Sequence, residues 1–211
     1  MKWNSDLAYI VGLITTDGCL SKDGRHIDFT SKDLDQVQNF IRILKLKNKI
    51  GLKSSGCSDK KYYRVQFGNV KFYRFLREIG LSPNKSKILG ILKIPEEYFA
   101  DFLRGNLDGD GYTTSFWDKL FPNSFRFYIA FVSGSINYLE WMKSEIERIY
   151  GIKGKIQPRV RAFQLKYSKK AAITLVKDLY KREDSQCLQR KRSKIQLALG
   201  IINKQAGMLE W

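Results

Sequence analysis

The sequence has little of what marks secreted, zinc-binding or membrane proteins. It contains three cysteines in 211 residues, and Cys19, Cys57 and Cys187 have no CxxC spacing, so neither a disulfide framework nor a zinc site is expected. No segment approaches the roughly 20 consecutive apolar residues of a membrane helix. The N-terminal residues lack the basic start and apolar run of a signal peptide. These absences indicate an intracellular protein with reduced thiols that does not associate with a membrane.

Acidic residues are scarce beside basic ones. The chain has 38 Lys and Arg against 21 Asp and Glu, a net charge of +17. The excess is shared, with 18 basic and 8 acidic residues up to Ile94, and 20 and 13 after it. Hydrophobic residues make up 43% of the chain, which predicts a packed core rather than disorder. A folded chain this basic is typical of a protein that binds a polyanion, most often nucleic acid.

The chain also repeats itself. Residues 63–80 and 163–180 each show an alternating strand pattern followed by an amphipathic helical pattern. Residues 27–44 and 129–146 share a second pattern, a strand, a serine-containing turn and a helix. The repeats predict an α/β fold of two pseudo-symmetric halves, residues 1–94 and 95–211.

Each half opens with a predicted helix that ends in Asp-Gly, over residues 7–18 and 99–111. Ser5 or Asp6 is expected to cap the first helix, and Pro95 with the two glutamates after it suits the first turn of the second. Gly18 and Gly111 are expected to end the helices in the left-handed conformation.

Two further glycines, Gly12 and Gly105, lie inside these predicted helices. A glycine there costs about 1 kcal/mol relative to alanine. That cost is understandable where two helix backbones approach closely, so we expect the two helices to pack against each other at these glycines.

The segments IVGLITTDG (10–18) and LRGNLDGDG (103–111) resemble the motif that names the LAGLIDADG homing endonuclease family. The resemblance covers nearly the whole chain, because the repeat units that follow each motif also match. It implies two αββαββα halves with saddle-shaped antiparallel sheets and the motif helices packed at the centre. It also implies an intron-encoded enzyme, monomeric because it has two motifs, that binds a long asymmetric site in double-stranded DNA. Such an enzyme cuts across the minor groove and leaves short 3′ overhangs.

Asp17 and Asp110 end the two motifs, where the carbonyl end of a helix disfavours a carboxylate by roughly 0.3–1 kcal/mol. Such a pair suggests a bound cation, and Mg²⁺ fits because it prefers oxygen ligands and is often held by carboxylates and phosphate oxygens. The resemblance implies the same role, with the backbone at Gly18 and Gly111 nearby, Mn²⁺ able to substitute, and Ca²⁺ supporting binding without cleavage. Asp108, one turn before, is not assigned as a ligand.

Three lysines are candidates for stabilising charge at the scissile phosphate. Lys85 and Lys191 lie at equivalent places in the closing basic segments 82–92 and 188–199, each six residues before an apolar position of an expected last helix. They resemble the active-site lysine of the family, which orders water around the metals. Lys32 resembles another such group, and its counterpart Gly134 leaves the second half without one. Ordinary phosphate contact or solvation is the alternative for each lysine.

Base recognition is expected from strands with a polar outer face. In residues 155–161 the basic and amide side chains alternate with Ile156 and Val160, which should point to the other face. Arginine and glutamine pair with guanine and adenine edges in the major groove. The candidate reading residues are Arg64, Gln66, Arg126, Tyr128, Lys155, Gln157, Arg159, Arg161, Gln164 and Lys166.

Other functions compete with a nuclease. An RNA maturase that assists intron splicing, or a DNA-binding regulator that does not cut, would share the fold. A basic RNA-binding protein would explain the charge but not two Asp-Gly-ended helices at the heads of repeats. Histidine-dependent nucleases are disfavoured because His26 is the only histidine. An intein host is not expected, since splice-junction residues are missing.

Overall fold

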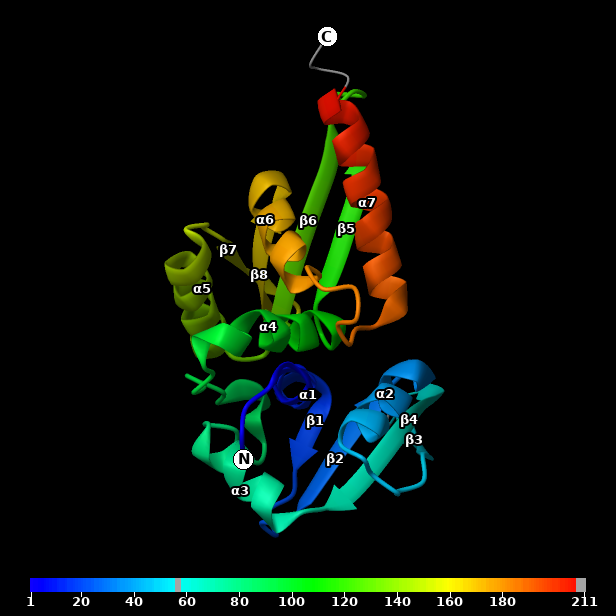
Figure 1. The fold of residues 1–211 in the computed structure, drawn as a ribbon, viewed down its shortest axis with the longest axis vertical. Coiled ribbons are helices and arrows are strands. Elements are labelled where there is room, and N and C mark those ends of the chain that lie inside the picture. The colour runs from blue at the N-terminus through cyan, green and yellow to red at the C-terminus, as the bar shows by residue number, and fades with distance from the viewer. Residues whose placement is uncertain (56–57, 208–211) are drawn as a thin grey trace.

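Two four-stranded antiparallel sheets, each with its own helices, build the structure (Figure 1). The computed structural model describes residues 1–55 and 58–207. The sheets have equivalent strand orders, β1-β2-β4-β3 and β5-β6-β8-β7. The predicted α/β class with two related halves is therefore confirmed. Cys57 lies outside the described residues. None of the helices in the described part of the chain is long and apolar enough to span a membrane.

The first half follows the predicted order of helix, two strands, helix, two strands, helix. Its elements are α1 (Ser5–Asp17), β1 (Gly18–Leu20), β2 (His26–Ser31), α2 (Leu34–Ile43), β3 (Gly51–Ser55), β4 (Ser58–Gly68), α3 (Val70–Glu78) and the 3₁₀ turn η1 (Lys85–Lys87). The expected helix over 82–92 is wrong, because only η1 forms there. Ile91 is 73% exposed, and Lys93 N–H donates to Ile79 O as the chain crosses to the second half.

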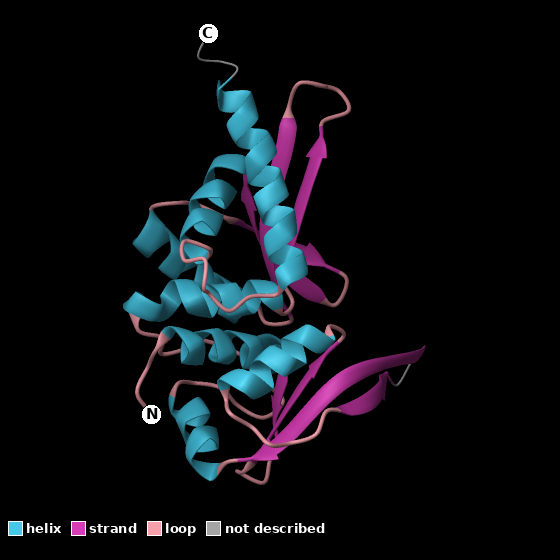
Figure 2. Ribbon diagram, turned by 45° about the vertical axis from the view of Figure 1, so that its right-hand side comes forward, coloured by secondary structure: helices cyan, strands magenta, loops and turns pink. Residues whose placement is uncertain are grey.

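The second half repeats this order and adds a long C-terminal helix. Its elements are η2 (Glu96–Tyr98), α4 (Phe99–Asp108), β5 (Tyr112–Trp117), β6 (Phe125–Ser133), α5 (Ile136–Tyr150), β7 (Lys155–Arg159), β8 (Ala162–Ser168), α6 (Lys169–Leu179) and α7 (Gln189–Gly207). In Figure 2 the strands of both sheets lie to the right of the helices that cover them. Leu197, the apolar position six residues after Lys191, lies on α7 as expected and is 70% exposed.

The helices α1 and α4 lie side by side across the centre of the molecule (Figures 1 and 2). A Cβ added at Gly12 would lie 2.3 Å from Phe102 O, and one at Gly105 would lie 2.2 Å from Tyr9 O. Any side chain at either glycine would push the two backbones apart. The predicted close approach at Gly12 and Gly105 is confirmed.

The predicted helix ends need correction. The N-cap of α1 is Asn4, whose Oδ1 accepts from Leu7 N–H at 2.7 Å, rather than Ser5 or Asp6. Pro95 does precede the first turn of the second motif segment, but that turn is 3₁₀. Gly18 has φ −89°, and Gly111 is not among the positive-φ glycines, so neither is left-handed. Both positions require glycine because there is no room for a side chain. An added Cβ would lie 2.6 Å from the Cα of Ile14 at Gly18 and 2.6 Å from the Cα of Leu107 at Gly111.

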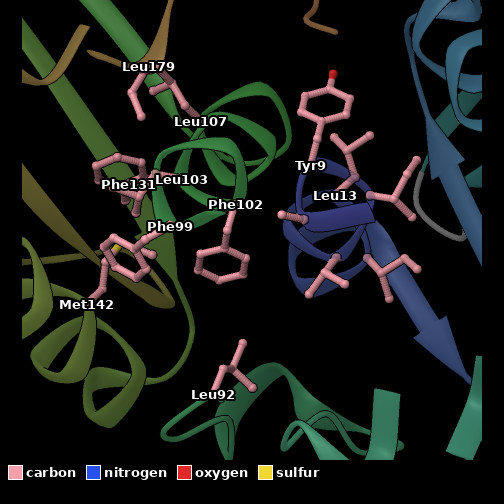
Figure 3. Close-up of a cluster of buried hydrophobic side chains, with 14 of the residues drawn as sticks. Tyr9, Leu13, Leu92, Phe99, Phe102, Leu103, Leu107, Phe131, Met142 and Leu179 are labelled. Atoms are coloured by element: carbon pink, nitrogen blue, oxygen red, sulfur yellow. The ribbon is translucent and has the colours of Figure 1, made fainter. Parts of the chain in front are cut away.

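The hydrophobic core runs from the helix pair into both sheets. Figure 3 shows Phe102, from α4, facing α1, while Leu103, Phe99 and Leu107 face the second sheet and its helices. The apolar positions of the repeat are buried as expected, among them Val65, Phe67, Phe72, Phe75, Leu76, Leu165, Tyr167, Ala172, Leu175, Val176 and Leu179. Burial of one large apolar side chain contributes roughly 1.5–3 kcal/mol, so this shared core fixes the helix ends that carry Asp17 and Asp110.

Candidate active site and nucleic-acid interface

Asp17 and Asp110 meet where the ends of α1 and α4 pack together. Asp17 is the last residue of α1, and Asp110 follows the last residue of α4 by two positions. Gly109 makes the close contact possible, because a Cβ there would lie 1.9 Å from Thr16 Oγ1 and 2.8 Å from Asp17 Oδ2. Both carboxylates line the same surface cavity. The structure thus brings together the two acids that the motifs pointed out.

The surroundings of this carboxylate pair disfavour its negative charge. Burial, and after it the nearby charge of Asp110, raise the pKa of Asp17 to about 7. Burial also raises the pKa of Asp110, while Lys85 and Lys191 oppose that shift. Two convergent carboxylates that resist ionisation would be stabilised by a cation between them. Their hard oxygen donors suit Mg²⁺, which keeps water and phosphate oxygens as further ligands.

The described side chains do not by themselves form a complete site for such a cation. Among residues 1–55 and 58–207 there is no cluster of three or more His, Cys, Asp and Glu side chains that could hold a metal ion. The Asp17–Asp110 pair fits a different arrangement, in which the phosphate of a bound nucleic acid supplies the remaining oxygen ligands.

Lys85 and Lys191 occupy equivalent buried positions beneath the two motif ends. Lys85 Nζ donates to Gly18 O at 2.5 Å, and Lys191 Nζ donates to Gly111 O at 2.7 Å. The Lys191 amine is also within 3.0 Å of the carbonyl oxygens of Leu107, Asp108 and Gly109. Burial lowers the pKa of Lys191 to about 8. Each ammonium therefore neutralises the carbonyl end of a motif helix, a contact that the sequence spacing did not reveal.

Lys32 directly follows β2 and lies beside the carboxylate pair. It lines a cavity of about 670 Å³ together with Asp17, Asp110 and Lys191. A second cavity, of about 50 Å³, is lined by Asp110 together with Lys85 and Gly134. The side chains that accompany the carboxylates thus differ between the two cavities.

The outer face of the second sheet carries most of the predicted reading residues. Phe125, Phe127, Ile129 and Phe131 are buried, so the alternate residues of β6 face outward. The strand register places the partners of those residues on the same outer face. This face contains Tyr112, Thr114, Arg126, Tyr128, Gln164, Lys166, Lys155, Gln157 and Arg159.

Two residues of the predicted strand 155–161 lie elsewhere. The strand β7 ends at Arg159, and the chain turns at the next two residues. Val160 is 90% exposed rather than directed to the core, and Arg161 has φ 60°. The prediction for Val160 is wrong because a two-residue hairpin turn ends the alternation there.

The outward-facing side chains of the second sheet hold each other in place. Gln164 Oε1 accepts from Tyr112 OH at 2.6 Å and from Arg159 Nη1 at 3.1 Å. Gln164 Nε2 donates to Gln157 Oε1 at 2.9 Å. Lys166 Nζ lies 3.9 Å from the ring centroid of Tyr128. Tyr112 was missed because it directly follows the motif, where the sequence gives no alternation from which to read its face.

The outer face of the first sheet carries fewer of the predicted reading residues. Arg64 and Gln66 alternate with buried Val65 and Phe67, as predicted. Arg64 forms an ion pair with Asp28, which lies on the neighbouring strand β2. Sequence reasoning missed Asp28, because an acid was not expected on a face that meets a polyanion. This pairing holds one edge of the Arg64 guanidinium against β2.

Comparison with known proteins gives the fold a name. Residues 4–80 match the family model described as a LAGLIDADG-like domain. The LAGLIDADG meganuclease I-AabMI bound to uncleaved DNA is similar over 98% of this chain and 92% of its own, with TM-score 0.64 and 12% identity. The chain has the LAGLIDADG fold. Full-length DUF199/WhiA from Thermatoga maritima is similar over 100% of this chain and 68% of its own, with TM-score 0.61 and 15% identity.

A third LAGLIDADG-fold structure was determined with metal and DNA. I-DmoI in complex with DNA and Mn is similar over 83% of this chain and 96% of its own, with TM-score 0.54 and 16% identity. No curated protein matches the chain by sequence. The fold that the resemblance implied is therefore confirmed, and the family model includes the first of the two motif segments.

Asp108, at the sixth position of the second LAGLIDADG motif, is bound to protein groups. Its Oδ2 accepts from Leu188 N–H at 2.6 Å and from Tyr9 OH at 3.0 Å. Burial raises the pKa of Asp108 to about 6. Leu188 lies three residues before Lys191, so Asp108 joins the first motif helix to the segment that carries this lysine. Thr15, the equivalent residue of the first motif, donates to Val11 O of its own helix.

Proposed function

We propose that the protein is a metal-dependent endonuclease that binds a specific site in double-stranded DNA and hydrolyses both strands. The observation that carries the proposal is the Asp17–Asp110 pair. The two carboxyl groups lie at the junction of the two halves, and the pKa of each is raised above its ordinary value. Carboxylates that converge in this way have an evident use only when a cation joins them. The LAGLIDADG fold, shared with DNA-bound meganucleases, supports the same proposal.

Binding would be carried by the outer faces of the two sheets. The halves, residues 1–94 and 95–211, each supply one sheet, and both sheets lie on the same side of the helices (Figure 2). A two-stranded ribbon fits the major groove, where arginine and glutamine distinguish base pairs. Because the reading residues differ between the halves, the target should be long and asymmetric. With one sheet in each half, a monomer suffices to cover it.

The chemistry follows from what surrounds the scissile phosphates. Asp17 and Asp110 would hold Mg²⁺ through their carboxylate oxygens, and such an ion activates water and stabilises the attacking and leaving oxygens. Lys85 and Lys191, by binding the carbonyls of Gly18 and Gly111, fix the two aspartates in position. Lys32 is exposed and lines the cavity beside Asp17, so it can approach a phosphate directly.

The test is cleavage of a randomised duplex library with Mg²⁺, Mn²⁺ or Ca²⁺, followed by sequencing of the cut ends. We expect discrete sites cut with Mg²⁺ or Mn²⁺, leaving short 3′ overhangs, and binding without cutting in Ca²⁺. Asp17→Asn and Asp110→Asn should bind the same sites and cut neither strand. Binding to one DNA sequence or to structured RNA, with no cutting by the wild type, would instead indicate a regulator or a maturase.

A further inference from the structure

The two cavities beside the carboxylate pair differ in size and in the basic side chains that line them. We propose that the protein cuts the two DNA strands at different rates, and that the strand on the Lys32 side is cut first. A nicked duplex would then accumulate before the double-strand break. This inference rests on the proposed nuclease function and adds to it an order of events and the residue that causes it.

Lys32 and Gly134 are equivalent positions in the two halves. Each follows the last residue of a central strand, Ser31 in β2 and Ser133 in β6. The serine hydroxyl accepts a backbone hydrogen bond two residues on in both halves, from Asp33 N–H and from Ser135 N–H, each at 3.1 Å. The turns therefore match, and one presents a lysine where the other presents no side chain.

The missing side chain at Gly134 is built into the fold. A Cβ added there would lie 2.6 Å from Ser86 O, a backbone atom that cannot rotate away. Ser135 Oγ donates to Leu89 O at 2.5 Å and holds the same segment against the turn. The cavity beside Lys32 is about 670 Å³, whereas the cavity beside Gly134 is about 50 Å³.

The larger cavity also has more basic side chains than the smaller one. The larger cavity is lined by five basic side chains. Lys191 binds backbone carbonyls and Arg190 pairs with Asp33, so Lys32, Lys53 and Lys194 are the three that can face a phosphate. The smaller cavity is lined by one basic side chain, Lys85, whose buried amine already binds Gly18 O. Loss of one positioned group that stabilises developing negative charge slows a reaction by about 10²–10³ in measured cases. A strand lacking such a group should therefore be cut about tenfold or more slowly.

The experiment follows both strands of one duplex under single-turnover conditions in Mg²⁺. The duplex contains the selected target with its central base pairs made palindromic, and each strand has a different 5′ dye. Symmetric central base pairs remove local DNA sequence as a cause of unequal cutting. We expect the wild type to cut one strand about tenfold or more faster than the other. A supercoiled plasmid with the same site should pass through a nicked circle.

Lys32→Met identifies the cause. It should slow the faster strand to about the rate of the slower one and leave the slower strand unchanged. Lys32 is exposed, so the variant should keep its fold, and Lys71→Met is the matched control, since Lys71 is an exposed lysine on α3 in the helix layer. Equal rates in the wild type would overturn the inference alone, as would equal slowing of both strands by Lys32→Met. Absence of cutting on any site would overturn the proposed function as well.

Discussion

Replacing Asp17 by asparagine should stabilise the metal-free protein, even though it should abolish cleavage. In the absence of metal, the Asp17 carboxylate lies half-buried near Asp110, at the carbonyl end of α1. Asparagine keeps the size and the oxygen acceptor but removes the charge. The substitution therefore tests whether these acids are retained at a cost to stability.

The magnitude follows from the pKa of Asp17, which burial raises from 3.8 to about 7. A shift of about 3 pH units corresponds to roughly 4 kcal/mol between the charged and neutral forms. Because Asp17 keeps some solvent contact and shares its titration with Asp110, we expect Asp17→Asn to gain about 1–2 kcal/mol at pH 8. In a protein of this length that corresponds to a rise in Tm of about 2–8 °C.

The sign of the pH dependence is also fixed. A carboxyl whose pKa is higher in the folded state binds its proton more tightly there, so the folded state loses stability as pH rises from about 4 to about 7. The advantage of Asp17→Asn should therefore be small near pH 4 and complete above pH 7. Metal binding needs the ionised carboxylate, so Mg²⁺ should stabilise the wild type at pH 8 more than at pH 6.

The assay is thermal unfolding in EDTA and in Mg²⁺, between pH 4 and pH 8. Asp184→Asn is the control, because Asp184 is an exposed acid in the loop after α6. The wild type should gain stability from Mg²⁺ in proportion to its occupancy, and Asp17→Asn should not. If Asp17→Asn is less stable than the wild type in EDTA at pH 8, the carboxylate is stabilising and the reasoning fails.

Three other predictions concern the helix pair, the lysines and base recognition. Gly12→Ala should cost about 3 kcal/mol or more in urea unfolding, because its Cβ would lie 2.3 Å from a backbone oxygen; an unchanged midpoint would contradict the close packing. Lys191→Met should cost about 3 kcal/mol and more than Lys85→Met, since it leaves four carbonyl oxygens rather than one without their donor; equal losses would oppose this. Arg159→Ala should relax specificity at a limited set of base pairs in a library selection, whereas uniform weakening would make it a phosphate contact.

The packing of the two motif helices could be predicted because each predicted helix contains an internal glycine. A glycine there costs stability unless two helix backbones must approach closely, and the structure shows Gly12 against Gly105. The repeated strand and helix patterns likewise gave the two sheets. Each of these features depends on short-range periodicity or on the steric role of a glycine, and both can be recognised in the sequence.

Other features depend on contacts between distant segments. Lys191 and Gly111 are 80 residues apart in sequence, and spacing alone does not show that this lysine would bind a helix end. Gly18 and Gly111 were read as left-handed caps because that is the usual reason for glycine after a helix. In the structure each is needed because its chain turns back against its own last helical turn. The residue type was informative, but the reason for it required the fold.

The difference between Lys32 and Gly134 was visible in the sequence, but its cause was not. Sequence alone identified Gly134 as the counterpart of Lys32. The structure adds a physical reason for the glycine, because the carbonyl oxygen of Ser86 leaves no room for a Cβ at Gly134. Asymmetry in a repeated fold can therefore be maintained by backbone packing as well as by side-chain identity. A Gly134→Lys substitution alone should not make the two sides equal, because the segment around Ser86 would have to move first.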